Sequence, residues 1–380
     1  MKIRGNYFAP GPLTDTVKTF RSTAAVSILL LAAVPAKGQV RIDFEKYEPV
    51  STLVVPGHHV SSAAFPFVDV HSHQRNMDAD RLESLAQAMD TLNMRVMVNL
   101  SGGSGESLAQ QTTAVKQHYP GRFLVFANID FDGVGEKNWT ENAVKQLEED
   151  VRNGAAGLKI FKNLGFSVSD RDGRRVPVDD PRLDAIWEKC GELNIPVLIH
   201  TADPAPFWQE AGEQNERWLE LITHPRRKRG ANDPAPWEQL IEEQHRMFKK
   251  HPNTTFIAAH FGWYANDLKK LDSLLNAMPN VMIEFGAVIA ELGRQPRMAR
   301  QFFTKNQDRI LFGKDSWVPE EYATYFRVLE TEDEYFPYHK KYHAFWRMYG
   351  LGLEENILKK VYYKNALRVI PALDESLFPE

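Results

Sequence analysis

Residues 67–73 read Phe67-Val68-Asp69-Val70-His71-Ser72-His73, and this stretch decides the fold class. Its apolar, β-branched part predicts a buried strand. Side chains two positions apart on a strand point to the same side, so His71 and His73 share one side. At the mouth of a barrel, both imidazoles could bind one metal ion. The pattern also occurs by chance on surface strands, so the remainder of the chain must decide.

Further apolar strands follow from residue 65 onward and alternate with amphipathic helical stretches. The predicted strands are Phe67–His71, Arg95–Leu100, Phe123–Ile129, Gly157–Phe161, Val197–His200, Thr255–His260, Val281–Phe285 and Ile310–Gly313. The predicted helices include Arg81–Leu92, Asn142–Arg152, Arg182–Leu193, Glu238–Lys250 and Asp267–Ala277. This alternation favours parallel β-α-β units. Eight such strands predict a single-domain (β/α)8 barrel of the TIM type.

The main alternative is a doubly wound open sheet. That fold normally carries a glycine-rich phosphate loop after its first strand, where this chain has His71-Ser72-His73. The barrel is therefore favoured. The fifth predicted strand ends at His200 and the sixth begins at Thr255, so we expect an insertion between strands five and six.

The N-terminal residues 1–36 are predicted to be a signal peptide. Basic residues precede an apolar run from Ala24 to Ala36, which is too short to span a bilayer and has the length of a signal-peptide core. A disordered tail with an apolar patch is the alternative. A true signal makes the mature protein exported, either periplasmic or secreted; otherwise it is cytoplasmic. The remaining predicted regions are an extended N-terminal arm at 37–64, the barrel at 65–372 and a C-terminal tail at 373–380.

The composition is that of an ordinary globular protein, with 380 residues of which 43% are hydrophobic and 25% charged. The net charge of −4, without a basic stripe, argues against nucleic acid as a partner. We expect a small-molecule substrate and no stable membrane span, and a homo-oligomer is compatible with the sequence. The single cysteine, Cys190, excludes an intramolecular disulfide. The basic run at 226–229 is interpreted as a solvated loop, with attraction of an anionic substrate as the alternative.

Metal-binding residue types follow several of the predicted strands. Active sites of (β/α)8 barrels lie at the C-terminal strand ends, so these side chains are expected to converge. Neutral imidazoles with a carboxylate suit Zn²⁺ and similar ions, and a bound ion lowers the pKa of its water toward about 7. The residues at the strand ends are His71, His73, Lys159, Lys162, His200, His260, Glu284 and Asp315.

The sequence resembles the amidohydrolase superfamily, in particular its amidohydrolase-related branch (amidohydrolase 2) of metal-dependent hydrolases and decarboxylases. The resemblance spans about residues 65 to 370 and ends in a stretch, 362–368, that is similar to the closing helix of the family. It is carried by Asp69-Val70-His71-Ser72-His73, His200, Ala259-His260-Phe261-Gly262 and Leu311-Phe312-Gly313-Lys314-Asp315.

The resemblance implies a role for each matching residue. His71, His73, His200 and Asp315 would bind a divalent metal, with zinc expected, and Asp315 would also accept a proton from water. His260 would bind a second metal or donate a hydrogen bond to the substrate. One ion is favoured. Two are possible if Lys159 is carboxylated and bridges them, while the alternative is that its amine pairs with a carboxylate.

Three further residues lie where a substrate could bind. Arg294, after strand seven, could clamp a substrate carboxylate, or it could form a structural salt bridge with Glu291 or another acid. Trp263 and Tyr264 follow His260 and could form an aromatic wall.

The favoured function is hydrolysis of an amide, ester or lactone by metal-activated water, on a small carboxylate-bearing molecule. The alternative is non-oxidative decarboxylation of an aromatic or unsaturated acid at the same metal. A catalytically inactive binding barrel is the third and least favoured interpretation.

Overall fold

The computed structural model describes residues 49–379 of the chain. The fold below is that of the unit that begins at Val50. The predicted signal peptide at 1–36 and most of the arm's first half lie outside the described residues, so both stay predictions.

This unit is a (β/α)8 barrel, as predicted. Its strands are parallel, and those of the barrel in the described chain are β1 (Phe67–Ser72), β2 (Met94–Asn99), β3 (Phe123–Val125) continued by β4 (Ala127–Asn128), β5 (Leu158–Ile160), β6 (Val197–Ile199), β7 (Phe256–Ala258), β8 (Val281–Glu284) and β9 (Ile310–Leu311). They pair in the orders β1-β2-β3 and β4-β5-β6-β7-β8-β9.

Backbone hydrogen bonds join these two sheets at both of their edges. Phe126 separates β3 from β4, and its N–H donates to the carbonyl of Asn99 at 2.9 Å. At the other edge, the N–H of Val70 donates to Phe312 at 3.0 Å and the N–H of Asp315 donates to His71 at 2.7 Å. The last strand therefore returns to the first, and the ends of β1 and β9 are held side by side.

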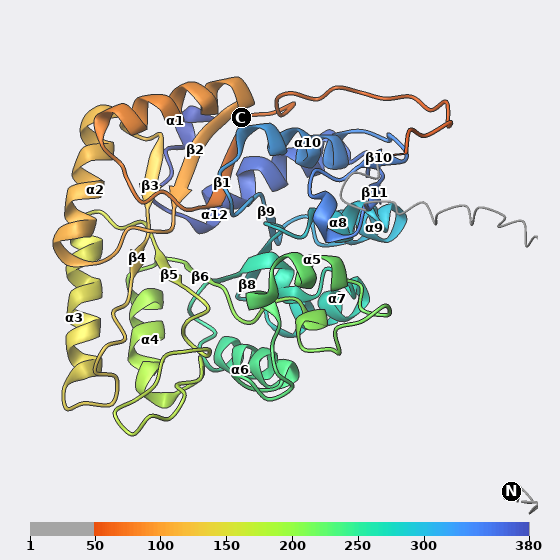
Figure 1. Cartoon of the computed structure of the whole chain (residues 1–380). Coiled ribbons are helices and arrows are strands. Elements are labelled where there is room, and N and C mark those ends of the chain that lie inside the picture. The colour runs from red at the N-terminus through yellow and green to blue at the C-terminus, as the bar shows by residue number, and fades with distance from the viewer. Residues whose placement is uncertain (1–48, 380) are drawn as a thin grey trace, which may run out of the picture. The chain divides into compact units, whose positions relative to one another are not determined.

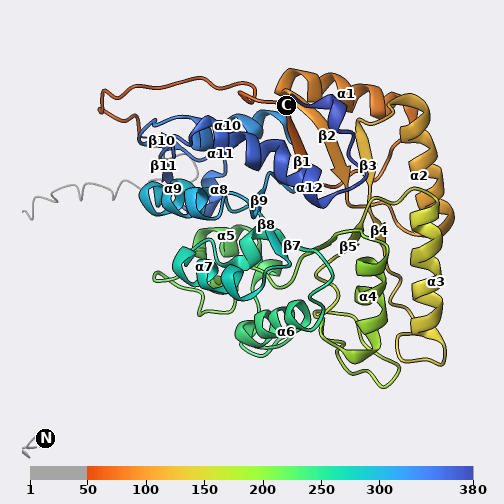
Figure 2. The same cartoon turned by 180° about the vertical axis from the view of Figure 1, so that it is seen from behind.

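Helices cover the outside of the strands, as Figure 1 and the reverse view in Figure 2 show. In both views α2 and α3 lie at the outer edge, far from α8 and α9. The helices are α1 (Ala79–Leu92), α2 (Gly105–His118), α3 (Trp139–Arg152), α4 (Asp184–Glu192), α5 (Trp218–Thr223), α6 (Trp237–Lys250), α7 (Leu268–Ala277), α8 (Ile289–Gly293), α9 (Pro296–Lys305), α10 (Tyr322–Glu330), α11 (Glu355–Lys359) and α12 (Asn365–Val369).

Helix α1 shows why the sequence folds this way locally. The Asp78 side chain accepts a hydrogen bond from the N–H of Arg81 at 2.9 Å, which satisfies one unpaired donor of the first turn. Leu82, Leu85 and Met89 recur at helical spacing and are buried against the sheet. The helix ends at Asn93, whose φ of 64° is a left-handed cap.

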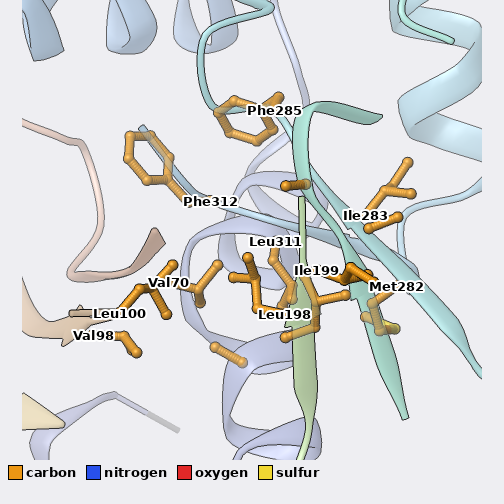
Figure 3. Packing of buried hydrophobic residues seen from close by; sticks show 14 of the residues in the cluster. Val70, Val98, Leu100, Leu198, Ile199, Met282, Ile283, Phe285, Leu311 and Phe312 are labelled. Atoms are coloured by element: carbon orange, nitrogen blue, oxygen red, sulfur yellow. The ribbon is translucent and has the colours of Figure 1, made fainter. Parts of the chain in front are cut away.

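Buried apolar side chains from strands far apart in sequence pack together around the barrel strands (Figure 3). The residues labelled there are Val70, Val98, Leu100, Leu198, Ile199, Met282, Ile283, Phe285, Leu311 and Phe312. Phe312 also packs on Phe67, with ring centroids 4.7 Å apart. This dense packing closes the lower part of the barrel, so polar chemistry is confined to the ends of the strands.

The predicted insertion after strand five is present between β6 and β7 and contains α5 and α6. A second excursion, the β10–β11 hairpin (Phe336–Pro337 and Arg347–Met348), follows α10. Residues 50–64 contain no helix or strand, and they run beside α10 (Figures 1 and 2). The ring Nδ1 of His58 lies 2.6 Å from Asp333 and the N–H of Ala64 donates to Glu330 at 2.9 Å. Among the described helices, none is long and apolar enough to cross a membrane.

Candidate metal centre

The end of β1 and the residues after β9 bring three metal-binding side chains together. His71 Nε2 lies 3.2 Å from His73 Nε2, and Asp315 Oδ1 lies 3.5 Å and 3.6 Å from these two atoms. Asp315 has a φ of 80°, a left-handed backbone that a non-glycine residue adopts at a cost of roughly 1 kcal/mol or more. The backbone hydrogen bond to His71 holds it there.

These separations fit the ligands of a single small cation. Zn²⁺ binds nitrogen and oxygen at about 2.0–2.2 Å, and a tetrahedron of such bonds has edges of about 3.4 Å. The three atoms also form one of the groups whose potential ligand atoms all lie within 4.8 Å of one another. The donor set therefore suits a divalent metal.

Glu284 at the end of β8 orients the first histidine. Its buried carboxylate accepts hydrogen bonds from His71 Nδ1 at 2.9 Å, from the His260 N–H at 2.9 Å and from the Gly286 N–H at 2.5 Å. Because a carboxylate only accepts, His71 carries its proton on Nδ1, and Nε2 presents a lone pair toward His73 and Asp315. Burial also lowers the pKa of His71 well below its usual value and lowers the pKa of His73 to about 4, so both rings are neutral.

His200 and His260 form a second pair beside the first group. His260 Nδ1 lies 2.6 Å from the carbonyl of Gly286, and His200 Nε2 lies 3.0 Å from the carbonyl of Ala202. Carbonyls only accept, so these two nitrogens carry the protons. The remaining nitrogens, His260 Nε2 and His200 Nδ1, then face each other at 3.3 Å as two lone pairs. Such a contact is repulsive unless a proton or a cation lies between or beside them.

The predicted ligands are thus split between these two pairs of rings. His71, His73 and Asp315 have ligand spacing, whereas His200 is absent from both groups of described residues that satisfy it. The second such group is His71, His260 and Glu284. The rings of His71 and His260 are 5.2 Å apart, so both pairs open onto the same space. We call His71, His73, His200, His260 and Asp315 the strand-end cluster.

Lys159 on β5 lies near enough to Asp315 and Glu284 for their charges to act on it. Its side chain is buried, and Nζ has no hydrogen-bond partner among the described residues. Burial lowers its pKa to about 8, against the attraction of Asp315 and Glu284. The expected alternative, a direct pair with a carboxylate, is therefore not formed in the described chain.

The predicted substrate-binding residues differ in position. Trp263 lies at the strand-end cluster, with its ring 4.6 Å from that of His260 and its Nε1 donating to Thr201 at 2.7 Å. Tyr264 instead packs its ring on Trp237 of α6, at 5.7 Å. Tyr264 follows a left-handed turn at His260 to Trp263 and does not line the cavity described next.

The Arg294 side chain contacts other residues of the protein in a structural role. It forms an ion pair with Glu216 and lies over the ring of Trp346 at 3.9 Å. This matches the alternative of a structural salt bridge, although the acid is Glu216. Glu291 instead pairs with Arg217, a residue of the insertion.

A cavity of about 190 Å³ opens above the strand-end cluster and is called the mouth cavity below. It contains residues that sequence reasoning missed, above all Arg217 and Lys340, which come from the insertion and the β10–β11 hairpin. Glu284 was placed at a strand end by the sequence but was given no role there, and its contact with His71 supplies that role. The mouth cavity is lined by Lys162, His200, Asp203, Pro204, Phe207, Arg217, Glu220, Arg227, His260, Trp263, Ala287, Asp315, Lys340 and His343.

Histidines and carboxylates converging at the C-terminal strand ends of a (β/α)8 barrel define the class of metal-dependent barrel enzymes. The family model of the amidohydrolases (Amidohydro_2) matches residues 55–372. The chain therefore belongs to the amidohydrolase family, whose members are metal-dependent enzymes.

Solved structures with the same fold are distant in sequence. An uncharacterised TIM-barrel protein from Bordetella bronchiseptica is 16% identical, with a TM-score of 0.51 over 81% of this chain and 99% of that one. A 2,6-dihydroxybenzoate decarboxylase from Rhizobium is 15% identical, with a TM-score of 0.51 over 81% and 99%. A dihydroxybenzoic acid decarboxylase from Polaromonas with bound manganese is 14% identical, with a TM-score of 0.51 over 82% and 99%. No curated protein matches the chain.

Proposed function

We propose that this chain is a metal-dependent hydrolase that cleaves an amide, ester or lactone bond of a small carboxylate-bearing molecule. The observation that carries the proposal is the set of ring nitrogens that face one another beside Asp315, of which those of His71, His200 and His260 carry lone pairs. His71 Nε2 and His73 Nε2 lie 3.2 Å apart, and His200 Nδ1 and His260 Nε2 lie 3.3 Å apart. A divalent cation, for which we propose zinc, would accept these lone pairs and remove the repulsion between His200 and His260.

His71, His73 and Asp315 would hold the ion, with His200 or His260 completing the set. A divalent ion bound there lowers the pKa of a coordinated water toward about 7 and polarises a substrate carbonyl. Asp315 accepts the proton of the attacking water and transfers it to the leaving group. Glu284 keeps the proton of His71 on Nδ1 throughout, and Trp263 forms an apolar wall that orients the substrate.

Decarboxylation is the second candidate, and the observation that favours it is the lining of the mouth cavity. Four cationic side chains line it, namely Lys162, Arg217, Arg227 and Lys340. Three of them pair with Asp203 or Glu220, and Lys340 has no such partner among the described residues, so it is the cation available to a substrate that is itself an acid. In this reaction the substrate carboxylate leaves as CO2, and Asp315 or a neighbouring group supplies a proton to carbon.

The test separates the two reactions by their products. Metal-loaded protein is incubated with amides, esters, lactones and aromatic acids in water enriched in ¹⁸O, and CO2 release is recorded in parallel. The hydrolase proposal expects ¹⁸O in the product carboxylate and no CO2. Release of CO2 without ¹⁸O incorporation would establish the decarboxylase instead. Protein that binds no metal and converts none of these compounds would support an inactive binding barrel.

A further inference from the structure

Most of the cationic side chains that line the mouth cavity form ion pairs with carboxylates of the protein itself. Lys162 Nζ lies 2.6 Å from Asp203, and Arg217 lies 2.8 Å from Glu220. Arg227 also pairs with Glu220. The first pair joins the residues after β5 to the insertion, and the other two lie within the insertion. All three leave little positive charge for a ligand.

Lys340 is the exception in this lining. It is half-buried, and none of the described residues forms a hydrogen bond or ion pair with its ammonium group. Glu321, the acid nearest to it in electrostatic influence, already accepts a hydrogen bond from Lys314 at 2.7 Å. It also lies 3.5 Å from His339 Nε2. A cation that lines a cavity and has no partner in the described chain is available to an anion from outside the chain.

The loop that carries Lys340 is held in place on both sides. His339 Nδ1 lies 3.1 Å from the hydroxyl of Thr324 on α10. On the other side, the His343 N–H donates to the carbonyl of Lys340 at 3.1 Å, and His343 Nδ1 lies 3.1 Å from Arg217. The backbone of Lys340 is thus fixed between α10 and the insertion. Because this backbone is already fixed, little further conformational entropy is lost when a ligand binds the Lys340 side chain.

Lys340 shares the mouth cavity with the catalytic residues. His200, His260 and Asp315 form the floor of that cavity, and Lys340 belongs to its lining from the β10–β11 hairpin. A ligand that reaches the strand-end cluster with one end can therefore meet Lys340 with the other.

We propose that Lys340 binds an anionic group of the substrate, a carboxylate that is separate from the group that reacts at the metal. This inference rests on the proposed function for the reacting end of the substrate. It narrows the substrate class to molecules with two functional ends, one reactive carbonyl or carboxyl group and one carboxylate that stays unchanged. Lys340 would thus be a specificity-determining residue supplied by the hairpin and not by a barrel strand.

The experiment uses two aromatic probes of nearly equal shape. Isophthalate has two carboxylates, and 3-carbamoylbenzoate replaces one of them with a neutral amide. Calorimetric titration of the full chain measures both dissociation constants, with and without added zinc, for the unchanged protein, Lys340→Met, Lys340→Arg and the control Lys341→Met. Lys341 is adjacent and exposed, and it does not line the cavity.

We expect the unchanged protein and Lys341→Met to prefer isophthalate by about tenfold or more, the worth of one charge-assisted contact. Lys340→Met should lose that preference, and Lys340→Arg should keep it within about threefold. A preference that persists in Lys340→Met, or that is absent from the unchanged protein, overturns the inference. The metal-free titration still reports on Lys340 if the proposed metal chemistry fails, so the two failures are distinguishable.

Discussion

At the scale of single residues, proton positions explain why the strand-end cluster suits a cation. Three of its histidines place an N–H on a group that can only accept, namely Glu284, Gly286 and Ala202. Each ring therefore turns a lone pair inward. Hydrogen bonds within the protein orient these lone pairs toward the place of a metal ion. For His71, the partner that does so is Glu284.

Replacing Glu284 by Gln should weaken metal binding while leaving the protein folded. The amide can donate as well as accept, so the proton on His71 Nδ1 is no longer enforced. We expect zinc affinity to fall by about 10- to 100-fold, the usual effect of losing a partner that orients a ligand. Competition with a chelating dye measures the affinity, and Glu238→Gln, an exposed change on α6, is the control. Equal affinity in the two variants would refute the orienting role.

Replacing Asp315 by Asn tests the proposed proton transfer. The amide keeps the shape of the side chain, but it cannot accept a proton from water. We expect kcat to fall by about 10²- to 10⁴-fold, the range for loss of a general base. Metal content should be measured alongside, because Asp315 is also a proposed ligand. A variant that retains its metal and turns over at the normal rate would contradict the assignment.

The sequence predicts some site residues better than others, for physical reasons. His71 and His73 were predictable because a strand has a period of two, and His260 and Asp315 because parallel strands end at one edge. Lys340 and Arg217 were not predictable, since they lie on irregular segments without periodicity. The contact of Tyr264 with Trp237 was missed because it depends on left-handed residues at His260 to Trp263.

At the scale of elements, helix α6 carries a histidine whose neutral form the fold requires. His245 stacks on Tyr264, with ring centroids 6.0 Å apart. Burial lowers its pKa to about 4 from 6.5, with the charges of Lys249 and Lys270 acting in the same direction. Below pH 6.5 the unfolded chain therefore takes up a proton that the folded chain does not.

The stability contributed by His245 is complete above pH 6.5 and is lost as the pH falls toward 4. We expect this loss to be about 2 kcal/mol, after allowance for the partial exposure of the ring. His245→Phe keeps the stacking and removes the titration, so its free energy of unfolding should fall less between pH 7 and pH 4.5. Denaturant titrations at both pH values measure the difference. Parallel losses in the two proteins would show that the pKa of His245 is the same in the folded and unfolded states.

The strands themselves were predicted closely, because each is a short apolar run that is buried on both faces. Strand β3 was predicted as one strand with β4, and the structure divides them at Phe126. The reason lies in the hydrogen bonds on either side. The Phe126 N–H bonds back to Asn99 on β2, whereas the next N–H, of Ala127, bonds forward to Gly157 before β5.

At the scale of the whole molecule, the strand-end cluster joins segments that are distant in sequence. Its residues lie at the ends of β1, β6, β7 and β9, two pairs of neighbouring strands. The core below them packs aliphatic and aromatic side chains independently of the cluster (Figure 3). The fold should therefore not require a metal, although a bound metal should stabilise it.

Removal of the metal should lower the melting temperature without unfolding the barrel. A ligand that binds only the folded state stabilises it by RT ln(1 + [L]/Kd), about 2.7 kcal/mol at 100 times Kd. We expect chelated protein to keep its circular dichroism spectrum and to melt several degrees earlier, and added zinc to restore the melting temperature in proportion to the logarithm of its concentration. The variant His71→Ala should lose this response while keeping the spectrum. A melting temperature that is indifferent to chelator and zinc would argue against a metal bound by strands around the barrel, because such an ion must resist their separation.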